Sequence, residues 1–434
     1  MRKIIYSIFI LLIISSTAMA QVEMKLTLDQ CRQQALAHNE ELQKSELEIQ
    51  RAELDRKKAL SSKFPLLDGS LLGMTMKDQD MMGMKLQMRA FYLAGITVTQ
   101  PVYTGGRIKT GIQLSQVGID VAYLQQRKTC SEILCNVDRA WYALISVRQK
   151  IVMLEAYRHQ LEVVVDQIRH AVSAEMATEN DALRVEAKLL EMEYQLQKAR
   201  NGETLCRLSL CDVIGADLNT EIALADTTIT IVAPSALDEN ITGRPELGML
   251  QKNVEASKLQ EKMARADMLP TVALMGGYSY YGGMRLKGNV QAADGNFYPF
   301  TQKMNGGMPL AALVVKVPIF HWGKELRDVK KARLATEQAQ LSFQRVTRQL
   351  SIEARQAVQN VTDGYRMIKT AQKGQQQADE NLRVMKNRYD NGMATLTDLL
   401  DAESQWQNAH SQLIEAKTQY CIYQTEYRRV TAKW

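Results

Sequence analysis

One segment of the chain is written twice. AEMATENDALRVE at residues 174–186 and NGMATLTDLLDAE at residues 391–403 lie 217 positions apart and share six residue types at matching places. Pro101 and Gly106 match Pro318 and Gly323 at the same spacing. Farther upstream the spacing is 205, and Leu42, Ile49, Leu54 and Pro65 match Leu247, Val254, Leu259 and Pro270. In a chain of 434 residues this repetition predicts two copies of one structural unit.

Each copy contains a long stretch without proline, at residues 102–233 and 319–434. Both stretches are rich in Ala, Leu, Gln, Glu, Lys and Arg, which predicts long helices. A helix from about Gly106 to Val172 would be on the order of 100 Å long. Because a globular domain does not need such a length, we expect this part of the protein to span a distance.

Apolar residues recur along the first stretch in alternating steps of four and three. One run extends from Ile133 to Val172 with Arg158 as its exception, and the next from Ala182 to Val213 with Glu203 as its exception. This spacing is the seam of a coiled coil. We therefore expect two antiparallel helices, and the repeated segment is the tip that joins them.

Four segments are rich in Gly, Tyr, Thr and Val and predict strands, although their alternation is only partial. They are PLLDGSLLGMTM (65–76), AGITVTQPVY (94–103), PTVALMGGYSYYGG (270–283) and MPLAALVVKVPIF (308–320). The second pair has 12 more residues between its prolines, which we expect in a surface loop. Lipid does not tolerate an open sheet edge, and four strands cannot close a barrel. If these strands cross a membrane, several chains must contribute, and three chains would give twelve strands.

The first 20 residues have the pattern of a secretory signal peptide, with Arg2 and Lys3 before an apolar run and Ala18-Met19-Ala20 at its end. No later apolar run is long enough to cross a bilayer as a helix. The 54 basic residues less Arg2 and Lys3 stand against 48 acidic ones, a net charge of +4 spread along the chain. We therefore expect no nucleic-acid partner. The histidines show no metal-ligand spacing, and no cofactor or catalytic motif is found.

The chain resembles the TolC family of outer-membrane efflux channels over nearly all of its mature length. The similarity rests on LTLDQCRQQALAHNEEL (26–42), where Thr27 and Gln30 form a predicted capping box. It rests most strongly on RYDNGMATLTDLLDAESQWQNAHSQLIEAKTQY (388–420), with the duplication and the Pro-Gly elements. The resemblance implies a mainly α fold with β structure. Duplicated antiparallel helical hairpins from three chains would form a periplasmic tunnel, and four strands per chain a twelve-stranded outer-membrane barrel.

This resemblance divides the chain into a signal peptide (1–20), a first repeat (21–213), an equatorial linker (214–243) and a second repeat (244–434). It implies a passive exit duct, not an enzyme, of a tripartite efflux or type I secretion system. Its partners would be two other copies, a periplasmic adaptor, an inner-membrane pump and outer-membrane lipid. The alternative is a periplasmic coiled-coil adaptor or spacer, but an adaptor normally has one hairpin between β-rich domains.

Asp398 and Asp401 lie three residues apart on one helix face. Spacing alone favours ordinary roles, with Asp398 capping the helix together with Thr395 and Asp401 as an exposed charge. The resemblance instead implies that both carboxylates line the constriction at the periplasmic mouth of the tunnel.

The resemblance also implies a latch that holds the tips closed. Tyr389 would bond to Asp181 of the neighbouring hairpin, with Asn180 and Arg388 beside them, whereas a packed aromatic residue is the ordinary interpretation of Tyr389. Ala394 stands where the best-known member has an arginine, and Arg388 or Arg184 could replace it. The residues expected to contact the adaptor are those of the two turns, Glu175, Met176, Ala177, Gly392, Met393 and Ala394.

The first strand pair is rich in methionine, at positions 74, 76, 81, 82, 84 and 88. Thioethers suit Cu(I), which makes a copper or silver exporter one hypothesis. A methionine-rich loop in a chain with 22 methionines is the simpler interpretation and the one we favour.

Overall fold

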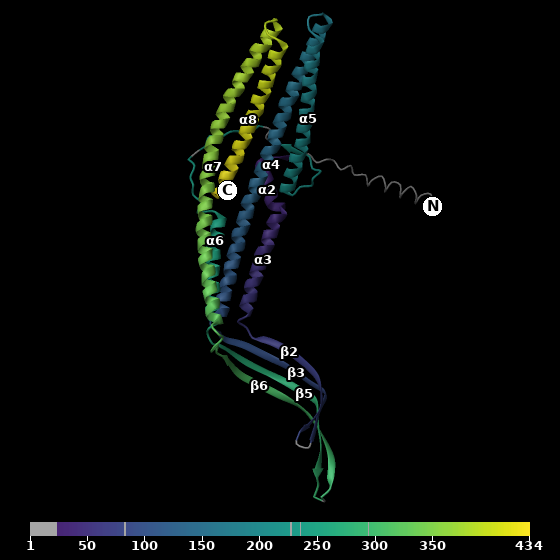
Figure 1. Cartoon of the computed structure of the whole chain (residues 1–434), viewed down its shortest axis with the longest axis vertical. Helices are drawn as coiled ribbons and strands as arrows, with labels where there is room; N and C mark the ends of the chain where they lie inside the picture. Colours follow the sequence, from purple (N-terminus) through teal and green to yellow (C-terminus); the bar gives the residue numbers. More distant parts are fainter. Residues whose placement is uncertain (1–23, 82–83, 226–227, 235, 294) are drawn as a thin grey trace, which may run out of the picture. The chain divides into compact units, whose positions relative to one another are not determined.

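The computed structural model describes residues 24–434 except 82–83, 226–227, 235 and 294, so the predicted signal peptide lies outside the described residues. A helical segment, a strand pair and a long helical hairpin occur twice in this order (Figure 1), as α2-α3-β2-β3-α4-α5 and, with a single first helix, as α6-β5-β6-α7-α8. The helices are α2 (Leu28–His38), α3 (Glu40–Ser61), α4 (Arg107–Ser173), α5 (Glu179–Ile214), α6 (Pro245–Ala266), α7 (Lys324–Asp390) and α8 (Leu396–Val430). In this part of the chain, no helix is both long and apolar enough to cross a bilayer.

The chain forms two compact units. One comprises the chain up to Leu47, Leu124–Gly248 and Gln344–Trp434, and the other comprises Glu48–Tyr123 and Met249–Phe343. Each unit takes segments from both halves of the sequence. The units therefore differ from the two sequence repeats, whose boundaries at residues 213 and 244 stay predictions.

The predicted long helices are confirmed, since α4 and α7 are each 67 residues long. The predicted seam of α4 is buried at Val137, Leu144 and Leu161, and the seam of α5 at Val185 and Leu210. The end of α4 packs against the start of α5, while Val137 and Leu210 share one cluster, so the two helices are antiparallel.

Both charged residues that interrupt the seams have ionic partners. Arg148 Nε donates to Glu203 Oε1 over 2.7 Å, and Arg158 Nε lies 3.4 Å from Glu162 Oε1. A charge within a coiled-coil seam is costly unless it is paired. Pairing therefore accounts for Glu203, whereas Arg158 Nε makes no hydrogen bond among the described residues and its side chain is tolerated because it is partly exposed.

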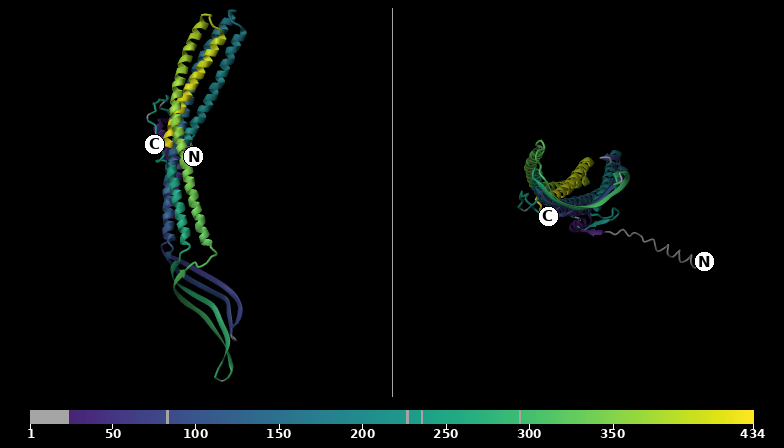
Figure 2. Two further views of the ribbon diagram at one scale, coloured as in Figure 1. Left: turned by 60° about the vertical axis from the view of Figure 1, so that its left-hand side comes forward. Right: turned by 90° about the horizontal axis from the view of Figure 1, so that it is seen from below.

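The second unit contains one antiparallel sheet in the order β2-β3-β5-β6, and the views in Figure 2 show it twisted. Its strands are β2 (Leu66–Met81), β3 (Met84–Thr104), β5 (Thr271–Gln291) and β6 (Phe297–Lys316). All four are longer than predicted. The expectation that the extra residues of the second pair form a surface loop is wrong in part, because β5 and β6 stay paired as far as Gln291 and Phe297.

The two faces of this sheet differ in polarity. Leu67, Leu71, Ile96, Tyr278 and Leu313 share one face by register and are all more than half exposed. On β2, β3 and β5, the opposite face carries polar residues such as Asp68, Ser70 and Thr97, although Leu66, Leu72 and Leu93 also lie on it. Such alternation is typical of a membrane barrel strand.

The linker between the two halves contacts both ends of the described chain. β1 (Met24–Leu26) pairs in parallel with β4 (Ile222–Leu224). At the other end, Tyr420 Oη donates to the Val232 carbonyl over 2.7 Å, and Lys433 Nζ lies 2.9 Å from Asp238 Oδ2. The linker is therefore held to both terminal segments, which is the arrangement expected of a belt.

A fully buried carboxylate joins three helices in this region. Asp138 of α4 accepts hydrogen bonds from Arg32 Nε and Nη2 of α2 at 2.8 and 2.7 Å, and from Thr425 Oγ1 of α8 at 2.8 Å. A two-pronged Arg–carboxylate pair with a third donor satisfies a buried charge. We infer that this residue fixes the packing of the first hairpin against the end of α8.

Candidate functional site at the helical tips

The first hairpin turns through a helix-ending motif at residues 171–176. Met176 N donates to the Ala171 carbonyl over 2.8 Å, and Glu175 N to the Val172 carbonyl over 3.0 Å. These two bonds define a Schellman motif, which requires one residue in the left-handed conformation. Glu175 has that role with φ of 58°, an uncommon conformation for a residue with a Cβ atom.

The second hairpin repeats the motif 217 positions later. Met393 N donates to the Arg388 carbonyl over 2.7 Å, and Gly392 N to the Tyr389 carbonyl over 2.9 Å. Gly392 takes the left-handed position with φ of 69° and without steric cost. The duplicated sequence therefore encodes a duplicated turn, with Glu in one copy and Gly in the other.

Each returning helix begins with a capping box. Asp181 N donates to Thr178 Oγ1 and Asp398 N to Thr395 Oγ1, both over 3.2 Å. In return, each threonine donates its backbone N–H and its hydroxyl to the aspartate carboxylate. These hydrogen bonds from Thr178 and Thr395 lower the pKa values of Asp181 and Asp398 below the ordinary value.

The two candidate constriction residues thus have different surroundings within one chain. Asp398 is the partner of the N-cap residue Thr395 in the capping box, as its spacing predicts, and it remains exposed to solvent. Asp401 lies one turn farther along the same face and is also exposed. Both carboxylates are available to face a symmetry axis.

Tyr389 lies between the hairpins and packs on a cluster that includes Val164, Val185 and Leu396. Thr178 bonds to Oδ2 of Asp181, and among the described residues no hydrogen bond joins the Tyr389 hydroxyl to this carboxylate. The latch between Tyr389 and Asp181 stays a prediction. Burial, then the nearby charge of Asp181, raises the pKa of Tyr389.

A different polar contact links the tips. Arg184 Nη1 of α5 donates to Thr397 Oγ1 of α8 over 3.3 Å. Arg388 has an electrostatic influence on Asp398, and Asn180 is exposed. Of the two arginines considered as replacements at Ala394, Arg184 is the one that bridges the hairpins.

Sequence reasoning missed Glu403, which is 1% exposed on α8. Among the residues that the structure describes, neither carboxylate oxygen has a hydrogen-bond partner, nor has the nearby Tyr157 hydroxyl of α4. Burial raises the pKa of Glu403 to about 7, although Lys386 and Lys188 oppose the shift. The sequence does contain a signal for this burial, because Leu399, Glu403 and Trp406 are spaced four and three residues apart and therefore share one largely apolar helix face.

A polar cluster lies beyond Glu403 on the same hairpin. Trp406 Nε1 donates to Asp379 Oδ1 over 2.7 Å, and His410 Nε2 lies 2.8 Å from the same oxygen. The Trp406 and His410 rings are in contact, with centroids 4.2 Å apart and planes tilted by 38°. Asp379 of α7 therefore ties two aromatic residues of α8 to its own helix.

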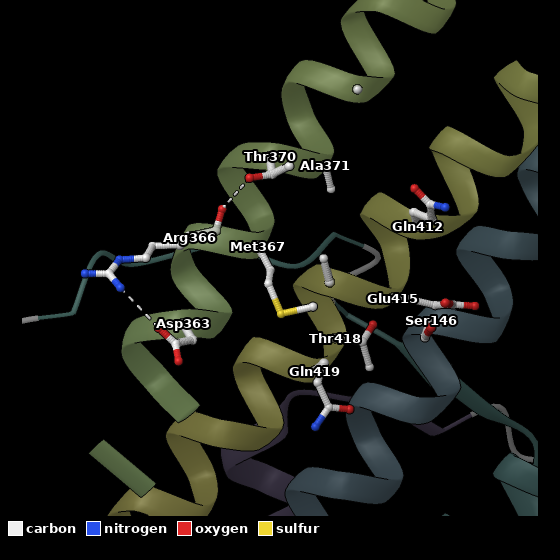
Figure 3. A pocket seen from close by; sticks show the side chains of 12 residues that line it. Ser146, Asp363, Arg366, Met367, Thr370, Ala371, Gln412, Glu415, Thr418 and Gln419 are labelled. Atoms are coloured by element: carbon white, nitrogen blue, oxygen red, sulfur yellow. Dashed lines mark hydrogen bonds and ion pairs between the residues drawn. The ribbon is translucent and has the colours of Figure 1, made fainter. Parts of the chain in front are cut away.

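Figure 3 shows a groove of about 940 Å³ lined by residues of α4, α7 and α8. Met367, Ala371 and Ala416 form part of its wall, and Arg366 at its side bonds to Asp363 over 3.2 Å. The wall mixes small residues, Met367 and the polar side chains of Asp363, Gln412, Glu415 and Gln419. Such a mixed surface between helices could accept a polar or an apolar helix face.

The sequence profile of the family described as outer membrane efflux protein matches residues 31–215 and 236–431. The chain belongs to the outer membrane efflux protein family. It is 21% identical over 337 residues to the protease secretion protein PrtF of Dickeya chrysanthemi, covering 75% of this chain and 69% of that protein.

Two solved outer-membrane proteins have a similar fold. The CmeC channel of Campylobacter jejuni has a TM-score of 0.78 at 18% identity, covering 93% of this chain and 85% of that one. VceC of Vibrio cholerae has a TM-score of 0.76 at 16% identity, covering 93% and 95%. Both similarities extend over the helical and the β parts of the chain.

Family membership confirms the resemblance to TolC-like channels. The protein is an outer-membrane efflux channel component with a mainly helical fold and a β-sheet, and it is not an enzyme. The alternative of a periplasmic coiled-coil adaptor is not favoured, because the match covers both halves of the chain, including both strand pairs.

Proposed function

We propose that this protein is the passive outer-membrane exit duct of a tripartite efflux or type I secretion system. It would be coupled to an inner-membrane pump through a periplasmic adaptor. PrtF, a protease secretion protein, and CmeC, an outer-membrane channel, support this assignment. Cargo would pass through the tunnel without chemical change.

The open sheet is the observation that carries the proposed assembly. In the described sheet, β2 and β6 each pair on one side only, and one face exposes large apolar side chains. Lipid does not tolerate unpaired strand edges, so the sheets of several chains must close together. Three chains would form a twelve-stranded barrel, with the apolar face toward outer-membrane lipid and the polar face toward the lumen.

The hairpins of the three chains would form the periplasmic tunnel. The groove lined by Met367, Ala371 and Ala416 would then pack against a helix of a neighbouring copy or of the adaptor. The linker at residues 214–243, held to both terminal segments, would surround the tunnel as an equatorial belt.

The turns are the proposed docking points for the adaptor. Met176 is 83% exposed and Met393 is 64% exposed, at matching positions of the two tips. An exposed, flexible thioether beside a small residue, here Ala177 or Ala394, is typical of an adaptable contact surface. We expect the adaptor to bind both tips in the same way, because both have the same backbone.

The proposed periplasmic gate is a ring of three Asp398 and three Asp401 side chains. Since Thr395 lowers the pKa of Asp398, this carboxylate stays charged at neutral pH. Six carboxylates around one axis repel one another, attract cations and favour opening. Packing of Tyr389 and the Arg184–Thr397 bond would oppose opening.

The assembly is tested by native mass spectrometry of the protein extracted from outer membranes in detergent. We expect a trimer that also crosslinks as a trimer in intact membranes. A monodisperse monomer that is soluble without detergent would contradict both the trimer and the barrel.

A further inference from the structure

The sheet register places methionines opposite each other in both strand pairs. Met76 of β2 stands opposite Met88 of β3. Met284 of β5 stands opposite Met304 of β6. The second pair belongs to the other half of the sequence, outside the methionine-rich segment.

The register between β3 and β5 brings these two pairs to the same level of the sheet without pairing them directly. Gln87 stands opposite Arg285, and Met88 and Met284 are their neighbours along the two strands, but the register shifts before the next pair, Tyr92 with Gly282. The sheet therefore carries two methionine pairs next to the last regular pair of β3 and β5. We call Met76, Met88, Met284 and Met304 the methionine row.

The row lies on one face of the sheet, and basic side chains occupy the other. Arg285 stands opposite Lys303, one position away from Met284 and Met304, so alternation puts these two cations on the opposite face. Lys85 and Lys287 are likewise opposite each other. The methionine thioethers thus lie on one face of the sheet, and the arginine and lysine side chains lie on the other.

The side chains of the row are close enough to share a ligand. Directly opposite residues in antiparallel strands have Cβ atoms about 4.5–5.5 Å apart. Met88, Met284 and Met304 are half-buried, and Met76 is 38% exposed, so a small ion can reach the sulfurs.

We propose that the methionine row is a binding site for a soft monovalent metal ion, Cu(I) or Ag(I). The thioether is a neutral, polarizable donor that selects such ions over Mg²⁺, Ca²⁺ and Zn²⁺. Three rotatable bonds allow two or three sulfurs from neighbouring strands to converge on one ion. The inference rests on the sheet register and not on the proposed duct, so its failure would leave the proposed function standing.

The test is metal binding by the purified full-length protein in detergent. Cu(I) is titrated anaerobically in competition with a chromophoric Cu(I) chelator, and Ag(I) is titrated by calorimetry in chloride-free buffer. We expect saturable binding, with sulfur as the only first-shell donor in X-ray absorption spectra.

The central pair is then replaced in the variant Met88→Leu/Met284→Leu. Leu and Met have similar volumes, so the sheet should fold, which circular dichroism and detergent-resistant assembly check. We expect affinity to fall about tenfold or more. The matched control is Met275→Leu/Met308→Leu, because neither residue stands opposite another methionine in the same sheet.

The control variant should bind like the wild type, and Met76→Leu/Met304→Leu should show a smaller loss than the central pair. Wild-type affinity in the central-pair variant would overturn the proposal, and so would an equal loss in the control. If the wild type shows no saturable binding, the proposal is wrong and the methionines are only part of the apolar surface of the sheet.

Discussion

The two hairpin tips have the same backbone conformation, but the side chains that follow each turn differ in burial and in ion pairing. Both turn through a Schellman motif and both begin the returning helix with a threonine–aspartate capping box. Eight residues after the cap, however, Glu186 of the first tip pairs with Arg169 over 2.7 Å, whereas Glu403 of the second is buried without a partner. The chain reversal is thus encoded by a few local hydrogen bonds. The helix faces have diverged in burial and charge.

This difference makes the second hairpin the one whose stability depends on protonation. Glu403 is surrounded by Tyr157 of α4, Lys188 of α5 and Lys386 of α7, with Glu191 near Tyr157. None of these groups donates a hydrogen bond to its carboxylate among the described residues. Deprotonation therefore leaves a buried charge that only more distant lysines offset.

The largest predicted effect follows from this burial. Because the pKa of Glu403 rises from 4.5 unfolded to about 7 folded, the folded state holds its proton more tightly. The stabilising contribution is complete below pH 4.5 and is lost as pH rises through about 7, a change of roughly 3 kcal/mol. Glu403→Gln should remove this dependence and be more stable than wild type at pH 8.

The matched control is Glu186→Gln in the first tip. It should leave the pH profile between 4.5 and 7 unchanged, because Glu186 is ion-paired near the surface. Denaturation in detergent at a series of pH values measures both variants. A Glu403→Gln profile that still declines over this range would show that another group is responsible.

The second prediction compares the left-handed residues of the two turns. Gly392→Ala should destabilise its tip by about 1–2 kcal/mol, because a Cβ atom is strained at φ of 69°. Glu175→Gly should be neutral or slightly stabilising, since relief of strain is offset by greater backbone entropy in the unfolded state. Hydrogen exchange of the turn amides measures the change in local stability of both variants. If both substitutions destabilise their turns equally, the left-handed positions of the two tips do not differ as predicted.

The smallest predicted effect concerns the caps, where the tips should behave alike. Thr178→Ala and Thr395→Ala each remove a capping hydroxyl and should cost about 1 kcal/mol of local stability. Hydrogen exchange in the first turns of α5 and α8 measures the loss. A clearly larger loss of stability at Thr395 would mean that the capping box of the second tip contributes more to local stability than that of the first tip.

The helical part could be predicted closely from the sequence. The proline-free stretches and the seam predicted the bounds of α4, and Thr-x-x-Asp spacing predicted the cap at Asp398, because helix signals are local. The sequence predicts the positions of the strands but not their full lengths, since their alternation is weak. It does not predict the methionine row, because the sheet brings together residues about 200 positions apart. Nor does the repeated motif that contains Glu403 predict that this side chain is buried without a partner.

The polar contacts between the hairpins are the least predictable feature of the site. The resemblance implies a bond between Tyr389 and Asp181, which stays a prediction, while the structure shows Asp181 in a capping box and Tyr389 packed among apolar residues. The Arg184–Thr397 bond depends on how the two hairpins approach each other. Such a contact requires a three-dimensional structure.

The central claim, a duct gated by carboxylates at its tips, is tested most directly by conductance in planar bilayers. Wild-type protein should form cation-selective channels that a trivalent cation blocks from the periplasmic side. Asp398→Asn/Asp401→Asn should lower cation selectivity and weaken the block while the trimer remains intact. Wild-type selectivity and block in this double variant would contradict the account, leaving both aspartates as a helix cap and a solvated surface charge.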